Sequence, residues 1–219
     1  MKKELIISHE GEASKIALIE DGRLFELHTE EQDSEYVVGD LFVGKVKKLA
    51  PNLNAAFVNI GSDKDAFLHY QDLGPEFRTY QNLLKGILNK KIQSPSLKSF
   101  PIEEEIDKNG MIDKVLSVGD EVLLQITKEP ISTKGERVST QISLTGRYLV
   151  LIPFDQKISV SKKIKESQEK TRLKTLIESI KPEGFGVIIR TVAENKKVAE
   201  LHNDMNQLIE KWNICFKNI

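Results

Sequence analysis

Residues 54–70, NAAFVNIGSDKDAFLHY, restrict the folds open to this chain more than any other stretch. Two runs of alternating character flank the polar segment GSDKD, which is the pattern of a two-stranded β-hairpin. Small and aliphatic side chains share one face of each run, which leaves Phe57 and Phe67 on the polar face. The residues of the apolar face are Ala56, Val58, Ile60, Ala66 and Leu68. The hairpin therefore places two large rings among polar neighbours.

The composition of the 219-residue chain is typical of a soluble globular protein, with 39% hydrophobic and 30% charged residues. No run approaches the roughly 20 apolar residues that span a bilayer, and no secretory signal precedes the first strand. The single cysteine excludes an internal disulfide framework and fits a reducing, cytoplasmic location. The formal net charge is −1, so any site for a polyanion must be local.

Short β runs recur along the chain and are interrupted once. Three strands are expected in the first 30 residues, with Asp21-Gly22 as a tight turn between the last two. Residues 75–117 form a partly helical or irregular insertion. The further runs lie at 38–51, in the hairpin, at 117–130 and, after a turn at 131–136, at 137–144. Five such runs with one insertion predict an OB-type barrel, whose exposed face commonly binds oligonucleotides.

An OB-type barrel would explain the two outward-facing rings. Unpaired RNA bases stack on aromatic side chains beside a basic groove. Lys45, Lys47 and Lys128 lie near Phe57 and Phe67 in the inferred strand layout. The alternative is that the insertion or a neighbouring domain covers both rings. We favour single-stranded RNA as the ligand, because the rings occur as a pair on adjacent strands with lysines nearby.

Four segments resemble the bacterial ribonuclease E/G family: GKVKKLAPNLNAAFVNIGSDKDAFL, VGDEVLLQITKEPISTKG, ISLTGRYLVLIP and GVIIRT. They occur in the family's order and cover nearly the whole chain apart from the insertion at 75–117. The resemblance implies an RNA-binding barrel of the ribosomal-protein S-one type. In that barrel Phe57 and Phe67 would stack RNA bases, and Lys128 and Lys134 would belong to the same surface.

The resemblance also implies a pocket that senses a 5′-monophosphate on an RNA end, formed here by Gly146, Val150, Arg190 and Thr191. The location suits an anion, since Arg190 and Thr191 fall between a predicted strand and a predicted helix. Arginine offers a bidentate fork for phosphate oxygens, and threonine adds a hydroxyl donor. Glycine at 146 would let the backbone approach the phosphate closely. Without the resemblance, Arg190 would be interpreted as a surface ion-pair residue.

These patterns predict an α+β, β-rich chain in three parts. Residues 1–36 resemble the N-terminal strands of a split RNase H-like subdomain. Residues 37–145 form a five-stranded OB-type RNA-binding barrel that carries the insertion at 75–117. Residues 146–219 form a small α/β sensor domain that ends in an amphipathic helix, and a further helix over 161–180 presents lysines beside the sensor.

The resemblance implies magnesium, and in many members zinc, for the full-length protein, with ligands outside residues 1–219. Family members hold magnesium with aspartates of a later DNase I-like subdomain and zinc with a Cys-Pro-x-Cys motif. Within the chain we predict no catalytic or metal-ligating residue: Asp63 and Asp65 belong to a hairpin turn, and Cys215 is interpreted as a packed thiol. This chain alone is therefore expected not to cleave RNA.

The expected function is the N-terminal, RNA-binding and 5′-monophosphate-sensing part of a ribonuclease G/E-type endoribonuclease that processes or degrades single-stranded RNA. Its expected partners are single-stranded RNA and 5′-monophosphorylated ends, with no membrane, and the full-length protein could form a homo-oligomer. The alternative is a stand-alone, non-catalytic OB-fold RNA-binding module acting in ribosome assembly or translation. The reading frame beyond Ile219 would distinguish the two.

Overall fold

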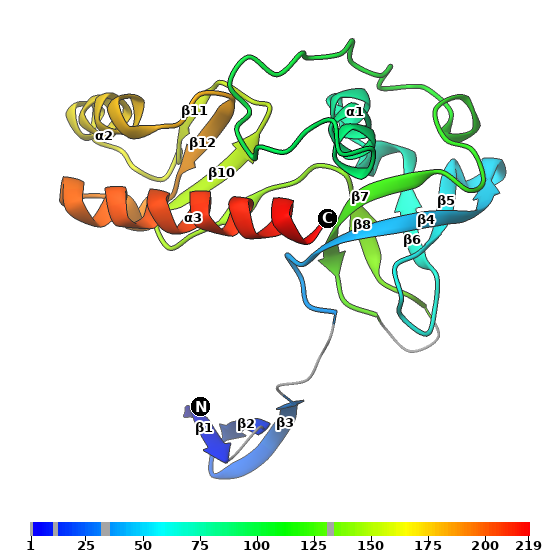
Figure 1. Cartoon of the computed structure of the whole chain (residues 1–219). Coiled ribbons are helices and arrows are strands. Elements are labelled where there is room, and N and C mark those ends of the chain that lie inside the picture. The colour runs from blue at the N-terminus through cyan, green and yellow to red at the C-terminus, as the bar shows by residue number, and fades with distance from the viewer. Residues whose placement is uncertain (1, 11–12, 32–35, 131–133) are drawn as a thin grey trace. The chain divides into compact units, whose positions relative to one another are not determined.

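The computed structural model describes residues 2–10, 13–31, 36–130 and 134–219. These belong to two compact units, residues 1–37 and residues 38–219 (Figure 1). The predicted turn at 131–136 lies partly outside the described residues. The first unit is a three-stranded antiparallel sheet in the order β1-β2-β3. Its strands are β1 (Lys3–Glu10), β2 (Ala13–Glu20) and β3 (Arg23–Glu31).

The β2–β3 connection is the tight turn predicted at Asp21-Gly22. Both residues have a positive φ, 47° and 80°, as a two-residue hairpin turn of this type requires. Large apolar side chains of this sheet are exposed, including Leu5, Ile7 and Phe25. The three strands therefore bury little apolar surface by themselves, and their assignment to a split subdomain stays a prediction.

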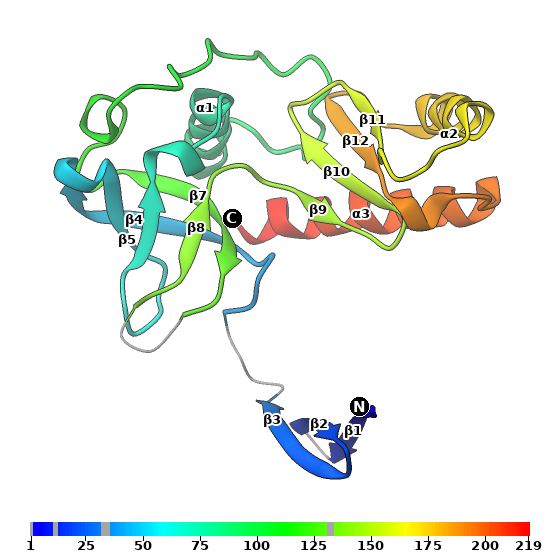
Figure 2. The ribbon, with the colours of Figure 1, turned by 180° about the vertical axis from the view of Figure 1, so that it is seen from behind.

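The second unit begins with a closed five-stranded barrel, which confirms the predicted OB-type fold. The strand order is β4-β5-β6-β8-β7 (Figures 1 and 2). Strands β6 and β8 pair in parallel, whereas the other barrel pairs are antiparallel. The strands are β4 (Leu41–Ala50), β5 (Ala55–Asn59), β6 (Ala66–His69), β7 (Glu121–Lys128) and β8 (Arg137–Ser139).

The barrel interior is filled by the side chains that the alternation predicted. Ala56, Val58, Ala66 and Leu68 are completely buried. Gly44 on β4 is required by this packing, because a Cβ atom there would lie 2.7 Å from Val58 Cγ1. Such a distance is shorter than carbon atoms tolerate without displacement of a neighbour.

The insertion at 75–117 is partly helical, as predicted, and is tied to the barrel. It contains α1 (Phe77–Leu88) and the short 3₁₀ helix η3 (Ile112–Lys114). Asn54, after β4, adopts the left-handed conformation with φ 47°. Its side chain accepts a hydrogen bond from the Ile112 N–H (2.7 Å) and donates one to the Gly110 carbonyl (3.0 Å). The far end of the insertion is therefore fixed to the turn between β4 and β5.

A second sheet follows the barrel, in the order β11-β12-β10-β9, and is packed against two helices (Figure 1). Strands β11 and β12 run parallel, and the other pairs are antiparallel. The strands are β9 (Leu144–Thr145), β10 (Leu149–Pro153), β11 (Ile158–Val160) and β12 (Phe185–Ile189). The helices are α2 (Ser167–Ile180) and α3 (Val198–Asn218).

Helix α2 starts later than the helix predicted over 161–180. The N–H of Ser161 donates to the Ile189 carbonyl (2.9 Å), which prolongs the β11–β12 pairing by one residue. A turn follows, in which the Ile164 N–H donates to the Ser161 carbonyl (3.2 Å). Ile164 is fully buried, but it precedes the helix. Strand pairing therefore overrides the helical pattern at this end.

The second sheet and its helices are joined to the barrel through a hydrophobic cluster that includes Leu123 of β7 and side chains of α1. Tyr80 of α1 donates to the Pro153 carbonyl (3.2 Å), and Trp212 Nε1 of α3 donates to the Pro95 carbonyl (2.7 Å). Leu123 of β7 belongs to the same buried cluster. The insertion and α3 therefore hold the two parts of this unit together.

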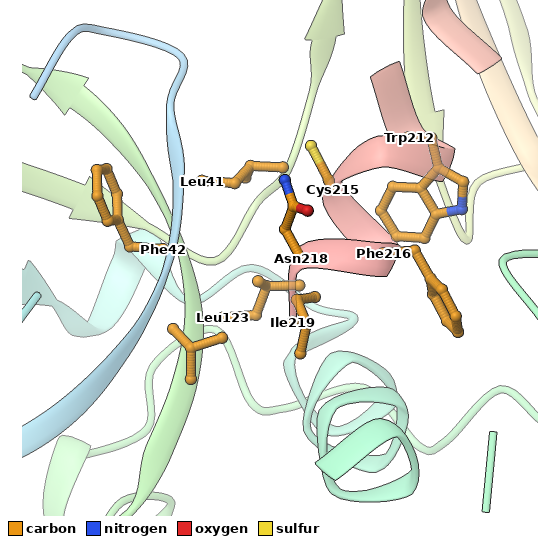
Figure 3. A pocket seen from close by; sticks show the side chains of 9 residues that line it. Leu41, Phe42, Leu123, Trp212, Cys215, Phe216, Asn218 and Ile219 are labelled. Atoms are coloured by element: carbon orange, nitrogen blue, oxygen red, sulfur yellow. The ribbon is translucent and has the colours of Figure 1, made fainter. Parts of the chain in front are cut away.

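The last turns of α3 meet β4 and β7 around a small cavity of about 150 Å³ (Figure 3). Leu41, Leu123 and Ile219 line it, together with Cys215. Cys215 is half-buried, and burial raises the pKa of its thiol. No helix within the described parts of the chain combines the length and apolar character needed to cross a membrane.

Candidate nucleic-acid interface

The two phenylalanines lie directly opposite each other on the outer face of the barrel. Phe57 of β5 pairs with Phe67 of β6, and both side chains are half-buried while their strand neighbours fill the interior. The ring centroids are 5.8 Å apart at an interplanar angle of 68°. This edge-to-face arrangement leaves part of both rings open to solvent.

Basic residues extend this aromatic pair into a row that crosses all five strands. Lys48 of β4 lies opposite Phe57, and Arg137 of β8 lies opposite Phe67. Lys128 of β7 lies opposite Arg137. Residues paired across strands share a face of the sheet, with neighbouring strands about 4.8 Å apart. The resulting basic-aromatic row is Lys48, Phe57, Phe67, Arg137 and Lys128.

A β-bulge decides which lysine of β4 faces the rings. The register shifts between Val46 and Lys48, so Lys48 rather than Lys47 pairs with Phe57. Lys45 lies opposite Asn59, two residues along β5 from Phe57, on the same face. A bulge inserts one extra residue and so reverses the alternation beyond it. Strict alternation from Lys45 predicts instead that Lys47 lies beside the rings.

Arg137 is held in place by an ion pair. Its Nε and Nη2 donate to the two carboxylate oxygens of Asp72, at 2.9 and 3.2 Å. This bidentate geometry restricts the guanidinium, yet the side chain remains 43% exposed. Arg137 therefore presents an oriented positive group next to Phe67.

Lys134 lies beside the turn that connects β5 and β6. The Phe67 N–H donates to the Glu136 carbonyl (2.7 Å), and Gly135 packs against the Asp65 backbone. Asp63 and Asp65 lie in this turn and are exposed. Lys134 is exposed as well.

His69 adds a third ring to the outer face. Its centroid lies 6.5 Å from that of Phe67, and its Nδ1 accepts a hydrogen bond from the Gln71 N–H (3.2 Å). That contact places the exchangeable proton of a neutral imidazole on Nε2. The aromatic surface therefore runs along β6 as well as across the barrel.

The residues of the predicted 5′-phosphate pocket meet at one end of the second sheet. Arg190 follows β12; its backbone N–H donates to the Tyr148 carbonyl (2.9 Å) and its Nη1 to the Gly146 carbonyl (2.5 Å). Thr191 Oγ1 lies 2.8 Å from Ser161 Oγ. The Arg190 contacts hold the segment after β12 against the turn between β9 and β10, and the Thr191 contact joins it to the segment after β11.

Val150 lies on the outward face of the same sheet. It pairs with Ile188 in the β10–β12 ladder, two residue pairs from the Tyr148–Arg190 contact. Val150 is half-buried and Ile188 is 39% exposed. The two form an apolar surface next to the polar turn.

Asp204 of α3 holds the turn between β9 and β10. Its buried carboxylate accepts hydrogen bonds from the backbone N–H groups of Arg147 (3.0 Å), Tyr148 (2.9 Å) and Leu149 (2.9 Å). A Cβ atom on Gly146 would lie 2.7 Å from Asp204 Oδ2. Glycine is therefore required here by the close approach of a carboxylate, a reason different from the one expected from the sequence.

An open hollow of about 480 Å³ lies beside this turn. It is lined by Arg147, Tyr148, Arg190, Val192 and Lys196. Three of these side chains are cationic, one is aromatic and one is aliphatic. Such a lining suits a ligand in which an anion is attached to a flat or apolar group.

No group of three or more His, Cys, Asp or Glu side chains that could hold a metal ion occurs within residues 2–10, 13–31, 36–130 and 134–219.

Comparison with known proteins places these features in a family. A model of the ribonuclease E/G family matches residues 143–219. Ribonuclease G of Escherichia coli is 32% identical over 212 residues, 97% of this chain and 40% of that protein. Ribonuclease G of Haemophilus influenzae is 32% identical over 209 residues, 95% and 39% of the two chains. Ribonuclease E of a Nostoc species is 32% identical over 206 residues, 90% and 26%.

The chain belongs to the ribonuclease E/G family. The similarity to ribonuclease G extends over both the barrel and the second sheet, since it covers 97% of the chain. The chain spans about 40% of the length of that ribonuclease G.

Three residues of the two candidate sites, Lys48, Arg137 and Asp204, were not predicted from the sequence. Lys48 was missed because a bulge is invisible to simple alternation, and Arg137 because a parallel pairing across the insertion has no local signal. Asp204 could have been found. It lies between Leu201 and Leu208 on the apolar stripe of the predicted helix, where a carboxylate needs a buried partner.

Proposed function

We propose that this chain is the RNA-binding and 5′-end-sensing part of a ribonuclease of the E/G family that processes or degrades single-stranded RNA. The basic-aromatic row carries the proposal: two partly exposed rings stand between cations on the outer face of a closed OB-type barrel. Membership of the ribonuclease E/G family supports RNA as the ligand.

The row suits a single strand rather than a duplex. Unpaired bases stack on aromatic side chains, while lysine and arginine neutralise the phosphates on either side. Phe57 and Phe67 are adjacent, so they would hold one or two bases, and His69 lies next along β6. Lys45, Lys128 and Lys134 would follow the backbone of the strand, in the manner of a positively charged groove.

The hollow beside Arg190 suits the 5′ end of the same RNA. A phosphate would accept from Arg190 and Thr191, which the contacts with Gly146 and Ser161 already orient. Val150 and Ile188 offer an apolar surface for the first nucleotide. A cytoplasmic location and a homo-oligomer of the full-length protein belong to the same proposal.

The stacking role is tested by replacing both Phe57 and Phe67 with alanine. We expect the free energy of binding to a fluorescent single-stranded RNA to weaken by about 2–6 kcal/mol in an anisotropy titration, since each stacked base contributes about 1–3 kcal/mol. The control is Phe25→Ala, which removes an exposed ring of the N-terminal sheet. Unchanged affinity of the double variant, with a native circular dichroism spectrum, would contradict the proposal.

The end-sensing role is tested with one short oligonucleotide carrying a 5′-monophosphate, a 5′-hydroxyl or a 5′-triphosphate. The oligonucleotide is too short to reach the barrel rings. We expect the monophosphate to bind most tightly, by about 1–3 kcal/mol, because a charge-assisted contact to Arg190 is absent with a hydroxyl. The bulk and charge of a triphosphate need not fit the same fork.

Arg190→Ala should abolish that preference, and Arg190→Lys should weaken it because an ammonium group lacks the planar fork. Equal binding of the three ends by the unmodified chain would show that Arg190 has no sensing role.

A further inference from the structure

The hollow beside Arg190 contains more positive charge than one arginine supplies. Arg147 and Lys196 also line it, and neither was among the residues implied by the family resemblance. Among the described residues that line the hollow, none carries a carboxylate. A site of three cations attracts a ligand with more than one negative charge.

Tyr148 holds both additional cations in position. Arg147 Cζ lies 5.3 Å and Lys196 Nζ 5.6 Å from the centroid of its ring, which are cation–π distances. The ring itself is fixed, because it is 7% exposed and its hydroxyl donates to Glu200 Oε1 (3.1 Å). Cations already held near the hollow lose less conformational entropy when a ligand binds.

Lys196 is only loosely paired. Its Nζ lies 3.6 Å from Glu200 Oε1, longer than a good hydrogen bond. Glu200 is engaged elsewhere, by the Tyr148 hydroxyl and by the backbone N–H of Lys197 (3.1 Å). The ammonium group can therefore turn toward an anion in the hollow without leaving a buried carboxylate unpaired, since Glu200 is only partly buried.

The main chain at Lys196 is also anchored. Arg172 of α2 donates to the Lys196 carbonyl (3.2 Å), and the Lys196 N–H donates to the Ala193 carbonyl (3.1 Å). The side chain thus projects from a fixed backbone position, which distinguishes it from a lysine on a free loop.

We propose that Lys196 and Arg147 bind the terminal 5′-phosphate together with Arg190, and that they determine the preference for phosphorylated RNA ends; the inference rests on the proposed function of this site. A phosphate monoester carries a charge of about −1.5 to −2 at pH 7 and presents three acceptor oxygens. One guanidinium fork satisfies two of these oxygens. Lys196, a compact charge on a flexible stem, and Arg147 supply the remaining donors.

The experiment compares Lys196→Ala, Arg147→Ala and the unmodified chain in binding a 5′-monophosphorylated trinucleotide and its 5′-hydroxyl form. The matched control is Lys197→Ala, which removes the same charge from the next residue, outside the hollow. We expect each hollow variant to reduce the ratio of the two affinities by about three- to tenfold, less than a buried charge-assisted contact would give because the hollow is open to solvent. Lys197→Ala should leave the ratio unchanged, and Lys196→Arg should restore most of it.

Three outcomes separate the inference from the function on which it rests. If the unmodified chain binds both ends equally, the end-sensing function fails and the inference fails with it. If the unmodified chain prefers the phosphate and the hollow variants keep that preference, only the inference is wrong. If Lys196→Ala weakens both oligonucleotides equally, the lysine contacts the RNA backbone in general, which also overturns the inference. Trp212 fluorescence verifies that each variant is folded, since Trp212 is the only tryptophan.

Discussion

At the scale of single residues, the carboxylate of Asp204 shapes the turn that presents the hollow. Three successive backbone N–H groups would otherwise point into a buried space without acceptors. The carboxylate accepts all three and so orients Gly146 and Arg147, on which the contact with Arg190 depends. A buried carboxylate destabilises the folded chain if it loses the N–H groups that donate to it.

Replacing Asp204 with asparagine should therefore lower the free energy of unfolding by about 2–3 kcal/mol. The amide keeps one acceptor oxygen but turns its NH₂ group toward backbone donors, and hydrogen bonds to charged groups contribute about 1.5–3 kcal/mol. Urea titration followed by circular dichroism measures the change. The control is Glu210→Gln, which removes an exposed carboxylate from the same helix. Equal effects of the two substitutions would show that the contacts of Asp204 are not stabilising.

At the scale of elements, helix α2 is connected to the start of α3 through one acidic residue. Glu169 accepts from Arg172 Nε (2.6 Å) and from the backbone N–H of Asn195 (2.8 Å). The Arg172 guanidinium holds the pKa of Glu169 below its usual 4.5, an effect opposed by burial and reinforced by the Asn195 N–H. This contact positions the segment that carries Lys196.

The lowered pKa of Glu169 predicts how stability depends on pH. The contribution of Glu169 to the free energy of unfolding is fully present above about pH 4.5. It is lost as the pH falls through the lower pKa of the folded state. At pH 7, Glu169→Gln should reduce the free energy of unfolding by about 1–2 kcal/mol, toward the low end because Arg172 is partly exposed and screened.

Urea titrations between pH 7 and pH 3 measure the difference in the free energy of unfolding between Glu169→Gln and the unmodified chain. This difference should become smaller as the pH is lowered. Glu178→Gln, on the exposed side of the same helix, should show little effect at any pH. A difference for Glu169→Gln that is independent of pH would mean that the carboxylate charge is not what stabilises the contact.

At the scale of the whole molecule, the buried cluster that joins Leu123 of the barrel to the second sheet should couple the unfolding of these two parts of residues 38–219. α1 and α3 contribute side chains to one buried cluster that also includes Leu123 of the barrel. Trp212 lies in that cluster and donates to Pro95 of the insertion. We therefore expect a substitution that destabilises the barrel to lower the urea midpoint reported by Trp212 as well.

Leu68→Ala tests this dependence. Leu68 is fully buried in the barrel, so its truncation should lower the free energy of unfolding by about 2–5 kcal/mol. We expect Trp212 fluorescence and far-ultraviolet circular dichroism to report the same lowered urea midpoint for residues 38–219. Leu53→Ala, at a 58% exposed position, serves as the control. An unchanged Trp212 midpoint in Leu68→Ala would show that barrel and sheet unfold separately.

Much of the fold follows from short-range pattern. The face on which Phe57 and Phe67 lie, the Asp21-Gly22 turn and the amphipathic stripe of α3 were all predicted, because each depends on a period or a turn within a few residues. The five-stranded barrel was also predicted, because five short β runs broken by one insertion are typical of an OB-type barrel. These features could be read before any contact was known.

Tertiary structure alone decided which residues complete each site. The β4 bulge brings Lys48 to Phe57, the parallel β6–β8 pair brings Arg137 to Phe67, and α3 brings Asp204 under Gly146. The bulge breaks the alternation within β4, and the other two contacts join segments that lie far apart in sequence, so no local periodicity predicts them. Their registers are set by packing across the barrel and the buried cluster, where burial of apolar surface selects one arrangement from many with the same local pattern.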